Sequence, residues 1–416
     1  MKQFVVFVFV ACAVFCVTSP LLAGGIDNKT NYSADYVRTL NRNAATDSAD
    51  AVVYNPAGVM KMEDGMYLKL DLQYTAIKEA TNRIGGTDFE SDATDIVPAL
   101  FALYKKDRWA AFAAFSIPAG GGTVEFEQGS ATSFGIGMGL TNHPILGAFY
   151  NTITDQYIEG KSVYYGYSAG GAYAFNDMLS VSLTARYVNA EKEANGFVTV
   201  ASPAPPTSFN VDYEQSDSGL GFILGANITP SEDWNIGLRY ETKTGLDLEY
   251  TVNRDDLDPL TPDPGGILPP TGTIENRDLP AIFGLGVAYT VSPKVKIEVD
   301  LTCYLNEDAD WSDPKFADVD NGFDLGVALE YTFSPELKGS VGYLLTQTGL
   351  DPDSLLPEWP ELDAHTVAAG VAYEFNSPWT LNAGLAKTFY GDETTSSGIT
   401  LEKDLILLAV GVQYRF

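Results

Sequence analysis

Along most of the chain, apolar and polar residues alternate with the two-residue period of a β-strand. In the run that ends the chain, one face carries Leu408, Val410, Val412, Tyr414 and Phe416. The residues between them are small or polar, and the first run, residues 66–76, has the same pattern. An apolar outer face over a polar inner face is typical of a membrane β-barrel, because a soluble barrel would bury its apolar face.

The pattern recurs often enough to close such a barrel. We expect about fourteen strands, an even number, as single-chain bacterial barrels have. They are predicted at residues 66–76, 95–104, 109–118, 162–175, 179–190, 211–228, 234–250, 279–291, 295–305, 322–333, 337–346, 365–375, 379–390 and 403–416. The sequence therefore predicts an all-β fold, an antiparallel transmembrane β-barrel.

The connections between these strands alternate in length. Short turns are predicted at residues 105–108, 176–178, 230–233, 292–294, 334–336 and 376–378. Long Gly/Pro/Asp-rich loops are predicted between them, notably at 119–161, 191–210, 251–278 and 347–362. Outer-membrane barrels have short turns in the periplasm and long loops outside, so we expect both termini to be periplasmic. Trp109, Trp234 and Trp379 each follow a short turn, which would place them at one membrane interface.

A β-propeller is the alternative all-β interpretation. Tyr-x-Phe phrases recur at Tyr331, Tyr373 and Tyr414 with a spacing close to that of propeller blades. A blade needs four short strands, however, and each repeat here contains two longer ones. The barrel is the better interpretation.

The N-terminus resembles a secretory signal peptide, residues 1–23, with Lys2, an apolar run and cleavage after Ala23. No other apolar run approaches the roughly 18 residues that a membrane helix needs. Cys303 is the one cysteine outside the signal, which excludes an intrachain disulfide. We expect export to the bacterial outer membrane, contact with outer-membrane lipids and lipopolysaccharide, and recognition of the C-terminal Phe416 by the barrel assembly machinery. A barrel of this size can work as a monomer.

The formal net charge is −30, which disfavours nucleic acid as a partner. Acidic residues concentrate in the predicted loops, for example Asp308, Asp351, Glu358 and Glu361. Solvated loops explain this, with divalent cations bridging to an anionic outer leaflet as the alternative. The sequence predicts no dedicated metal site.

Catalytic chemistry is scarce in the sequence. His143 and His365 are the only histidines and are far apart, so they offer little for a metal cluster or a catalytic triad. The Gly120-Gly121-Gly122 run lacks the Lys-Ser/Thr pair and the helix of a phosphate loop. We predict that the chain is not an enzyme and binds no cofactor.

Residues 24–65 precede the first strand and show no strand alternation. We expect them to form a hatch, or plug, in the lumen of a barrel that spans residues 66–416. The segment contains Asn55, Pro56, Ala57 and Gly58 shortly before the first strand. An Asn-Pro-Ala motif at this place, together with the pair of strands that follows and the aromatic C-terminus, resembles the FadL-like (OMPP1/FadL/TodX) outer-membrane transporters of long-chain fatty acids and aromatic hydrocarbons.

The resemblance implies passive uptake of hydrophobic molecules: capture by extracellular loops, binding in the lumen, movement of the hatch and sideways release through the wall. A kinked third strand would form the exit, at Pro118, Gly120, Gly121 and Gly122, where an ordinary strand end is the alternative. Apolar residues in the loop after it suit ligand capture, or else a small core of the loop itself. They are Phe134, Ile136, Met138, Leu140, Ile145, Leu146 and Phe149.

A fatty-acid cargo would also need a cation for its carboxylate. Arg186, Arg239 and Lys243 fall on inward faces by the alternation, although pairing with inward acids such as Asp71 or Glu241 is the alternative. Two other functions compete with hydrophobic transport. A general porin for polar solutes predicts an open lumen, and a structural or adhesive barrel predicts binding by the acidic loops.

Overall fold

The computed structural model describes residues 33–91, 94–257, 268–317, 319–376 and 378–416. The predicted signal peptide, residues 1–23, and the first part of the predicted hatch lie outside the described residues. No helix in the described part of the chain is both long and apolar enough to cross a membrane.

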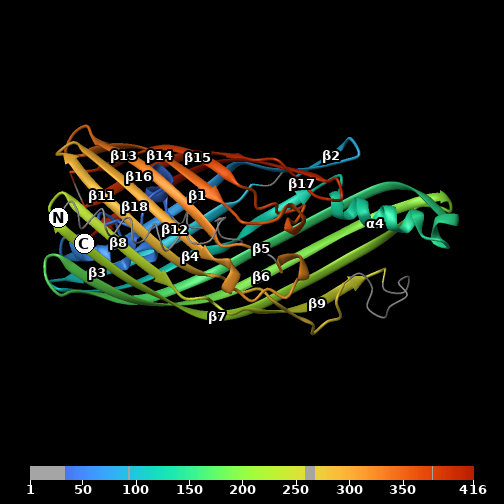
Figure 1. The fold of residues 1–416 in the computed structure, drawn as a ribbon, viewed down its shortest axis with the longest axis horizontal. Helices are drawn as coiled ribbons and strands as arrows, with labels where there is room; N and C mark the ends of the chain where they lie inside the picture. Colours follow the sequence, from blue (N-terminus) through green and yellow to red (C-terminus); the bar gives the residue numbers. More distant parts are fainter. Residues whose placement is uncertain (1–32, 92–93, 258–267, 318, 377) are drawn as a thin grey trace.

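The described strands form one antiparallel sheet that closes on itself (Figure 1). Four of its strands are short additions beyond the barrel ladder: β2 (Thr87–Glu90), β9 (Asp247–Asp255), β10 (Ile274–Asn276) and β17 (Glu393–Thr394). The other fourteen form the barrel, because β1 pairs with both β3 and β18. They are β1 (Gly65–Ile84), β3 (Ile96–Lys106), β4 (Trp109–Phe126), β5 (Tyr150–Ala174), β6 (Leu179–Pro203), β7 (Thr207–Ser231), β8 (Trp234–Glu241), β11 (Ala281–Ser292), β12 (Val295–Leu305), β13 (Gly322–Thr332), β14 (Leu337–Gln347), β15 (Ala364–Glu374), β16 (Trp379–Tyr390) and β18 (Thr400–Arg415).

The two faces of the sheet are those that the alternation predicts. On β1, Leu68 and Leu70 are 41% and 49% exposed, whereas Lys69 and Asp71, which alternate with them, are fully buried. On β18, Val410 is exposed and Gln413 is buried. Apolar side chains therefore cover the outside of the barrel and polar side chains line its lumen, as in membrane barrels. The predicted fold class and strand number are confirmed.

Several predicted loops are strand instead. Strands β5, β6 and β7 contain 25 residues each, far more than the roughly ten that cross a bilayer, and extend beyond the other strands toward α4 (Figure 1). The prediction of a long loop at 191–210 is therefore wrong over most of its length, and the predicted loop at 119–161 is strand at residues 119–126 and 150–161. Outside the hydrocarbon both faces of a strand meet water, so the apolar alternation ends while the ladder continues.

One predicted strand, residues 234–250, is in fact two. β8 ends at Glu241 and β9 begins at Asp247. Between them the chain leaves the ladder, and its contacts include an isolated bridge from Thr244 to Leu279.

Aromatic rings gather where the strands meet the short turns. Trp379 contacts Tyr414 with ring centroids 4.6 Å apart, and Trp234 contacts Tyr289 at 4.4 Å. Phe416 lies against Tyr414, and its backbone N–H donates to the Met66 carbonyl oxygen. The short-turn end thus carries the aromatic belt that the tryptophan positions predict.

The described helices are few. The N-terminal segment contains α2 (Ala34–Thr39), α3 (Ala51–Tyr54) and the 3₁₀ helix η1 (Pro56–Lys61), and one longer helix, α4 (Ala131–Asn142), lies between β4 and β5. Short 3₁₀ turns occur in the loops at η2 (Leu146–Ala148), η4 (Asn306–Asp308), η5 (Pro314–Phe316) and η6 (Pro352–Ser354). We call residues 33–62 the hatch segment.

The hatch segment is buried and hydrogen-bonded to the inner face of the sheet. Asp300 of β12 accepts the backbone N–H groups of Arg42 and Asn43, both at 2.6 Å. Arg38 donates to Glu330 of β13, and the Gln413 side chain of β18 accepts from the Ala49 N–H at 2.8 Å. Partners on several strands therefore hold this segment inside the barrel.

Glycines on the inner face let the hatch backbone approach the wall. A Cβ atom on Gly237 of β8 would lie 1.8 Å from the Asn43 carbonyl oxygen. One on Gly342 of β14 would lie 2.3 Å from the Thr39 carbonyl oxygen. No side chain fits at these distances, so glycine is required here.

Candidate functional site

The wall of the barrel is interrupted between β3 and β4. Their shared ladder reaches only to the pair Leu100 and Phe115. Strand β3 nevertheless pairs with β1 as far as Ile96, and β4 continues to Phe126. Residues 96–99 therefore have no ladder with β4. In hydrocarbon such backbone is tolerated only where it lines a cavity or is bonded by other protein groups.

Strand β4 is kinked beside this interruption. Its register with β5 shifts between Ser116 and Ala119 and again before Gly122. Gly120 and Gly122 have φ values of +93° and +75°, which glycine adopts readily. The prediction that the third strand ends at Pro118 is wrong, because the strand continues through the kink. The break in the ladder lies where the sequence placed it, and its role as an exit remains a prediction.

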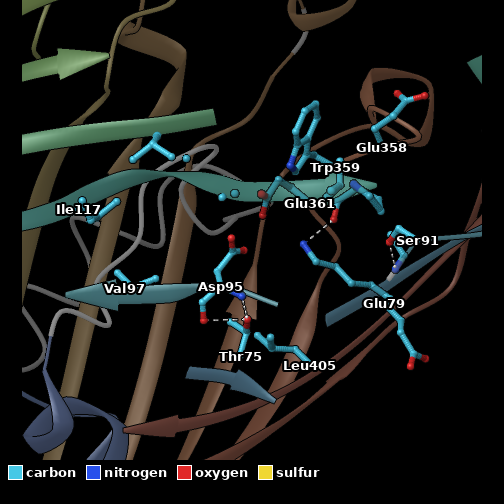
Figure 2. A pocket seen from close by; sticks show the side chains of 18 of the residues that line it. Thr75, Glu79, Ser91, Asp95, Val97, Ile117, Glu358, Trp359, Glu361 and Leu405 are labelled. Atoms are coloured by element: carbon cyan, nitrogen blue, oxygen red, sulfur yellow. Dashed lines mark hydrogen bonds between the residues drawn. The ribbon is translucent and has the colours of Figure 1, made fainter. Parts of the chain in front are cut away.

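Asp95 bridges the interruption. Its backbone N–H donates to Thr75 Oγ1 of β1 at 2.6 Å (Figure 2). Its Oδ1 accepts from the Thr123 N–H of β4 at 3.1 Å. A Cβ on Gly122 would lie 2.3 Å from Asp95 Oδ2. The carboxylate thus replaces part of the missing ladder.

A cavity of about 430 Å³, which we call the wall cavity, lies beside the interruption (Figure 2). Ile96, whose side chain is 68% exposed on the outer face of β3, contributes to its lining. So does Trp359, from the loop between β14 and β15. The lining therefore combines an outward-facing side chain of the barrel wall with an interior loop. The remaining lining includes Thr75, Val97, Ile117, Val163, Tyr165, Lys403 and Leu405.

A second cavity, of about 480 Å³, lies at the α4 end of the lumen. We call it the mouth cavity. It is lined by Ile136 of α4, by residues 158–162 of β5 and 192–195 of β6, and by Tyr213 of β7. The two cavities share four lining residues, which are Gly121, Glu358, Trp359 and Glu361.

An apolar cluster lies between the mouth cavity and the hatch end of the lumen. Tyr164 and Ala190 are paired on β5 and β6, next to the residues that line the mouth cavity, and both are fully buried. They pack with Leu246 and Leu248, which flank the start of β9. The cluster consists of Ala119, Tyr164, Val188, Ala190, Leu246, Leu248 and Leu279. We call it the lumen cluster.

A buried ion cluster follows along the same strands. Arg186 of β6 and Arg239 of β8 both pair with Glu241, and all three are at most 4% exposed. Lys243 pairs with Asp278 at 2.7 Å. The predicted carboxylate anchors thus have protein carboxylates as partners, the alternative considered for them. A buried unpaired charge is costly, which explains the pairing.

The hatch motif lies beneath this layer. Asn55 is fully buried, and its Nδ2 donates to the carbonyl oxygens of Asn43 at 3.1 Å and of Ala226 on β7 at 3.0 Å. The Ala57 carbonyl oxygen accepts from Ser180 Oγ of β6 at 2.7 Å. Pro56 opens the 3₁₀ helix η1. A Cβ on Gly58 would lie 2.0 Å from the Ala45 carbonyl oxygen.

The hatch also carries its own ion pairs. Arg42 pairs with Asp50 at 2.6 Å and with Asp47 at 2.8 Å. Burial by itself would raise the pKa of the Asp47 carboxyl, but Arg42, Lys296 and Arg38 together hold that pKa well below its usual range. The Asp47 carboxylate therefore stays charged and paired with Arg42 at neutral pH.

The predicted capture residues divide between two surroundings. Ile136, Leu140 and Leu146 pack in a small loop core with Val198 and Val200 of β6. Phe134 lies 5.7 Å, between ring centroids, from Phe89 of β2 in another such core. The side chains that remain on the surface are Met138, Ile145 and Phe149, at 41%, 68% and 54% exposed.

Sequence reasoning missed the residues that the two cavities share. The sequence predicts solvated loop positions for Glu358 and Glu361, yet Glu358 is 8% exposed and accepts from Ser130 Oγ at 2.5 Å. Trp359 lies between Pro357 and Pro360. The sequence feature that could have indicated this site is a tryptophan flanked by two prolines within an acidic loop. Among the described residues, no group of three or more His, Cys, Asp or Glu side chains is arranged to hold a metal ion.

Comparison with known proteins gives a consistent result. Residues 14–416 match the family model described as outer membrane protein transport protein (OMPP1/FadL/TodX). The comparison with curated protein sequences found no match.

Solved structures with similar folds include a Pseudomonas aeruginosa FadL homologue, with 16% identity, a TM-score of 0.67, and coverage of 94% of this chain and 100% of that one. The P. putida toluene transporter TodX has 15% identity and a TM-score of 0.64, over 89% of this chain and 96% of that one. The Ralstonia pickettii toluene transporter TbuX has 14% identity and a TM-score of 0.63, over 91% and 99%. At these identities the likeness shows a shared fold.

Proposed function

The chain belongs to the OMPP1/FadL/TodX family of outer membrane transport proteins, and from this premise we propose that it carries hydrophobic small molecules passively across the bacterial outer membrane. Its cargo would be long-chain fatty acids or aromatic hydrocarbons. The short-turn end, with both termini, would face the periplasm, and the mouth cavity would face outward. The protein would work as a monomer among outer-membrane lipids and lipopolysaccharide, with Phe416 recognised by the barrel assembly machinery during insertion.

The wall cavity carries this proposal. It lies where the β3–β4 ladder is missing, and its lining includes Ile96, which is exposed on the outer face. A molecule in this cavity could pass into the apolar part of the bilayer without crossing water. Straight passage down the lumen would instead meet the lumen cluster, then the Arg186–Glu241–Arg239 cluster, then the hatch segment. Sideways release therefore requires less rearrangement than axial passage.

Capture and hatch movement complete the proposed route. Met138, Ile145 and Phe149 give apolar surface beside the mouth cavity's helix, and exposed apolar surface favours hydrophobic ligands. A shift of the hatch segment, as the family resemblance implies, would loosen the floor beneath the lumen cluster. It would have to break the bonds of Asn55 to the β7 backbone.

A general porin is the competing function. A porin needs a continuous water-filled lumen. In the described residues, the lumen contains the buried hatch segment and the lumen cluster. These observations favour an apolar cargo over polar solutes.

The proposal is tested by uptake. The full-length protein, reconstituted in proteoliposomes, should accelerate the entry of radiolabelled toluene or palmitate over empty liposomes. It should leave the entry of a small sugar unchanged, because the lumen cluster and the hatch segment obstruct an aqueous path. Rapid sugar entry without an effect on either hydrophobic probe would favour the porin instead. Heat-modifiable migration in gels should confirm that the barrel is folded in each sample.

A further inference from the structure

Trp359 is one of the four residues that line both the mouth cavity and the wall cavity. Figure 2 shows it above the wall cavity, on the loop between β14 and β15. The loop is fixed at several points. Asn82 Nδ2 donates to the Pro357 carbonyl oxygen at 2.7 Å, and Lys403 Nζ donates to the Pro360 carbonyl oxygen at 3.1 Å. The indole is therefore held in place by its own loop.

Two glycines of the barrel wall provide the seat of the indole ring. A Cβ atom on Gly121 of β4 would lie 2.5 Å from Trp359 Cδ1, and one on Gly160 of β5 would lie 2.1 Å from a ring carbon at the other end of the indole. The ring thus lies against bare backbone on two neighbouring strands. Any larger residue at either position would push the ring away.

The polar groups around this ring favour some cargoes over others. Among the described residues, none forms a hydrogen bond with the buried Trp359 Nε1. Glu358 and Glu361 flank the ring in sequence and also line both cavities. Among the described residues, the lining of the wall cavity includes four acids, Glu79, Asp95, Glu358 and Glu361, and one basic residue, Lys403.

We propose that Trp359 is a gate between the two cavities and that, with Glu358 and Glu361, it determines specificity for neutral aromatic cargo over anionic cargo. This inference rests on the proposed transport function and names its substrate class. A flat neutral ring can stack on the indole as it passes. A carboxylate at the same place would lie beside two acidic side chains, which repel it in a site of reduced dielectric constant.

The gate is also linked to α4, which carries several of the predicted capture residues. Glu358 accepts from Ser130 Oγ, and Ser130 is the N-cap of α4. Ser130 also accepts the backbone N–H groups of Thr132 and Ser133. A displacement of α4 by cargo would therefore be transmitted directly to the loop that carries Trp359.

The test compares toluene with benzoate, two probes with the same ring and a different charge, in proteoliposomes of the full-length protein. Wild type should carry toluene at least roughly tenfold faster than benzoate, a ratio that one like charge at close range can impose. The double variant Glu358→Gln with Glu361→Gln should bind benzoate roughly tenfold more tightly in equilibrium dialysis and leave toluene binding unchanged. The substituted amide at position 358 keeps an oxygen that can accept from Ser130.

Trp359→Ala should join the two cavities, which would speed toluene entry and reduce the preference for toluene over benzoate. The matched control is Trp311→Ala, which removes another loop tryptophan; the N–H of Trp311 already donates to the Asp278 carbonyl oxygen at 2.8 Å, and Trp311 lines neither cavity. If wild type carries toluene but the Trp359 and Glu358/Glu361 variants match it for both probes, the gate is refuted and transport stands. If folded wild type carries neither toluene nor palmitate, the transport proposal itself fails.

Discussion

At the scale of single residues, the hatch segment is held by buried polar side chains whose hydrogen bonds fix their orientation. Asn55 donates both amide hydrogens to carbonyl oxygens, one within the hatch and one on β7. Gly237 has no side chain because the Asn43 carbonyl oxygen occupies that place. Each such contact is small in energy, but a buried partner left without its bond costs more than the bond itself contributes.

Asn55→Ala, combined with Pro56→Ala, should loosen the hatch without affecting barrel assembly. The loss of two buried hydrogen bonds should weaken hatch docking by about 1–3 kcal/mol. Hydrogen exchange of residues 33–62 should become faster, and toluene uptake should change. The control is Asn151→Ala, which changes an exposed asparagine of β5. Unchanged exchange and uptake in the double variant would show that the motif neither holds nor gates the hatch.

At the scale of elements, β4 belongs to the closed wall of the barrel in its first part and borders the interruption in its second part. Its first part pairs with β3 and β5, whereas its second part pairs with β5 alone. Two glycines with positive φ produce the change in direction. The resulting edge is bridged by Asp95 rather than by a further strand. An edge of this kind inside a membrane is expected only where it serves a cavity.

Gly120→Ala should straighten or destabilise the kink. The new Cβ would lie 2.3 Å from the Ser162 carbonyl oxygen, at a φ of +93° that L-residues rarely adopt. We expect the free energy of unfolding to fall by about 1–3 kcal/mol, which should lower the temperature at which heat-modifiable migration is lost. We also expect slower release of toluene into the bilayer, measured as slower uptake. Gly85→Ala is the matched control, because Gly85 also has a positive φ but nothing lies within 4 Å of its Cβ position. If both variants take up toluene at the same rate, the kink in β4 has no role in the release of cargo.

At the scale of the whole molecule, the lumen is arranged in layers. The mouth cavity, the lumen cluster, the buried arginine–glutamate cluster and the hatch segment follow one another along the strands. The wall cavity lies to the side of these layers, next to Trp359 and above the two charged layers. An apolar molecule therefore need not meet the charged floor of the barrel, where its presence would strip water and partners from buried ions.

The buried carboxylates of the hatch segment make its stability depend on pH. The pKa of Asp47 is well below its usual range in the folded protein, and the pKa of Asp35 is also lowered, since burial is outweighed by Lys69, Arg42 and Arg38. A carboxyl whose pKa falls on folding stabilises the fold fully above its unfolded pKa, near 4, and loses that contribution as the pH falls through the folded value. Ion conductance in planar bilayers should therefore stay low from neutral pH down to about 4 and rise only in stronger acid.

Arg42→Met should move this onset to higher pH, because Asp47 and Asp35 lose the charge of Arg42, which lowers the pKa of both carboxyls. The exposed pair of Arg83 with Asp88 provides the control variant Arg83→Met, which should leave the onset in place. A rise in wild-type conductance already between about pH 5 and 6 would contradict the role of these carboxylates.

By itself, the sequence determined the closed barrel, its fourteen strands and which face of each strand meets lipid. These features follow from a local period of two residues and from the contrast between hydrocarbon and a polar lumen, so neighbouring residues are enough to reveal them. It also indicated the break at Pro118 and Gly120–Gly122, since proline and glycine weaken a ladder wherever they occur. It misjudged strand ends outside the membrane, where both faces are wet.

Only the tertiary structure decided which groups meet across the lumen. Arg38 bonds Glu330 from 292 residues away, Arg186 and Arg239 converge on Glu241, and Trp359 lies against Gly121 and Gly160. These contacts depend on how far each strand is shifted against its neighbours as the sheet closes. Strand alternation records only the face of the sheet on which a side chain lies, and it carries no information about the height at which that side chain meets a partner from the opposite wall.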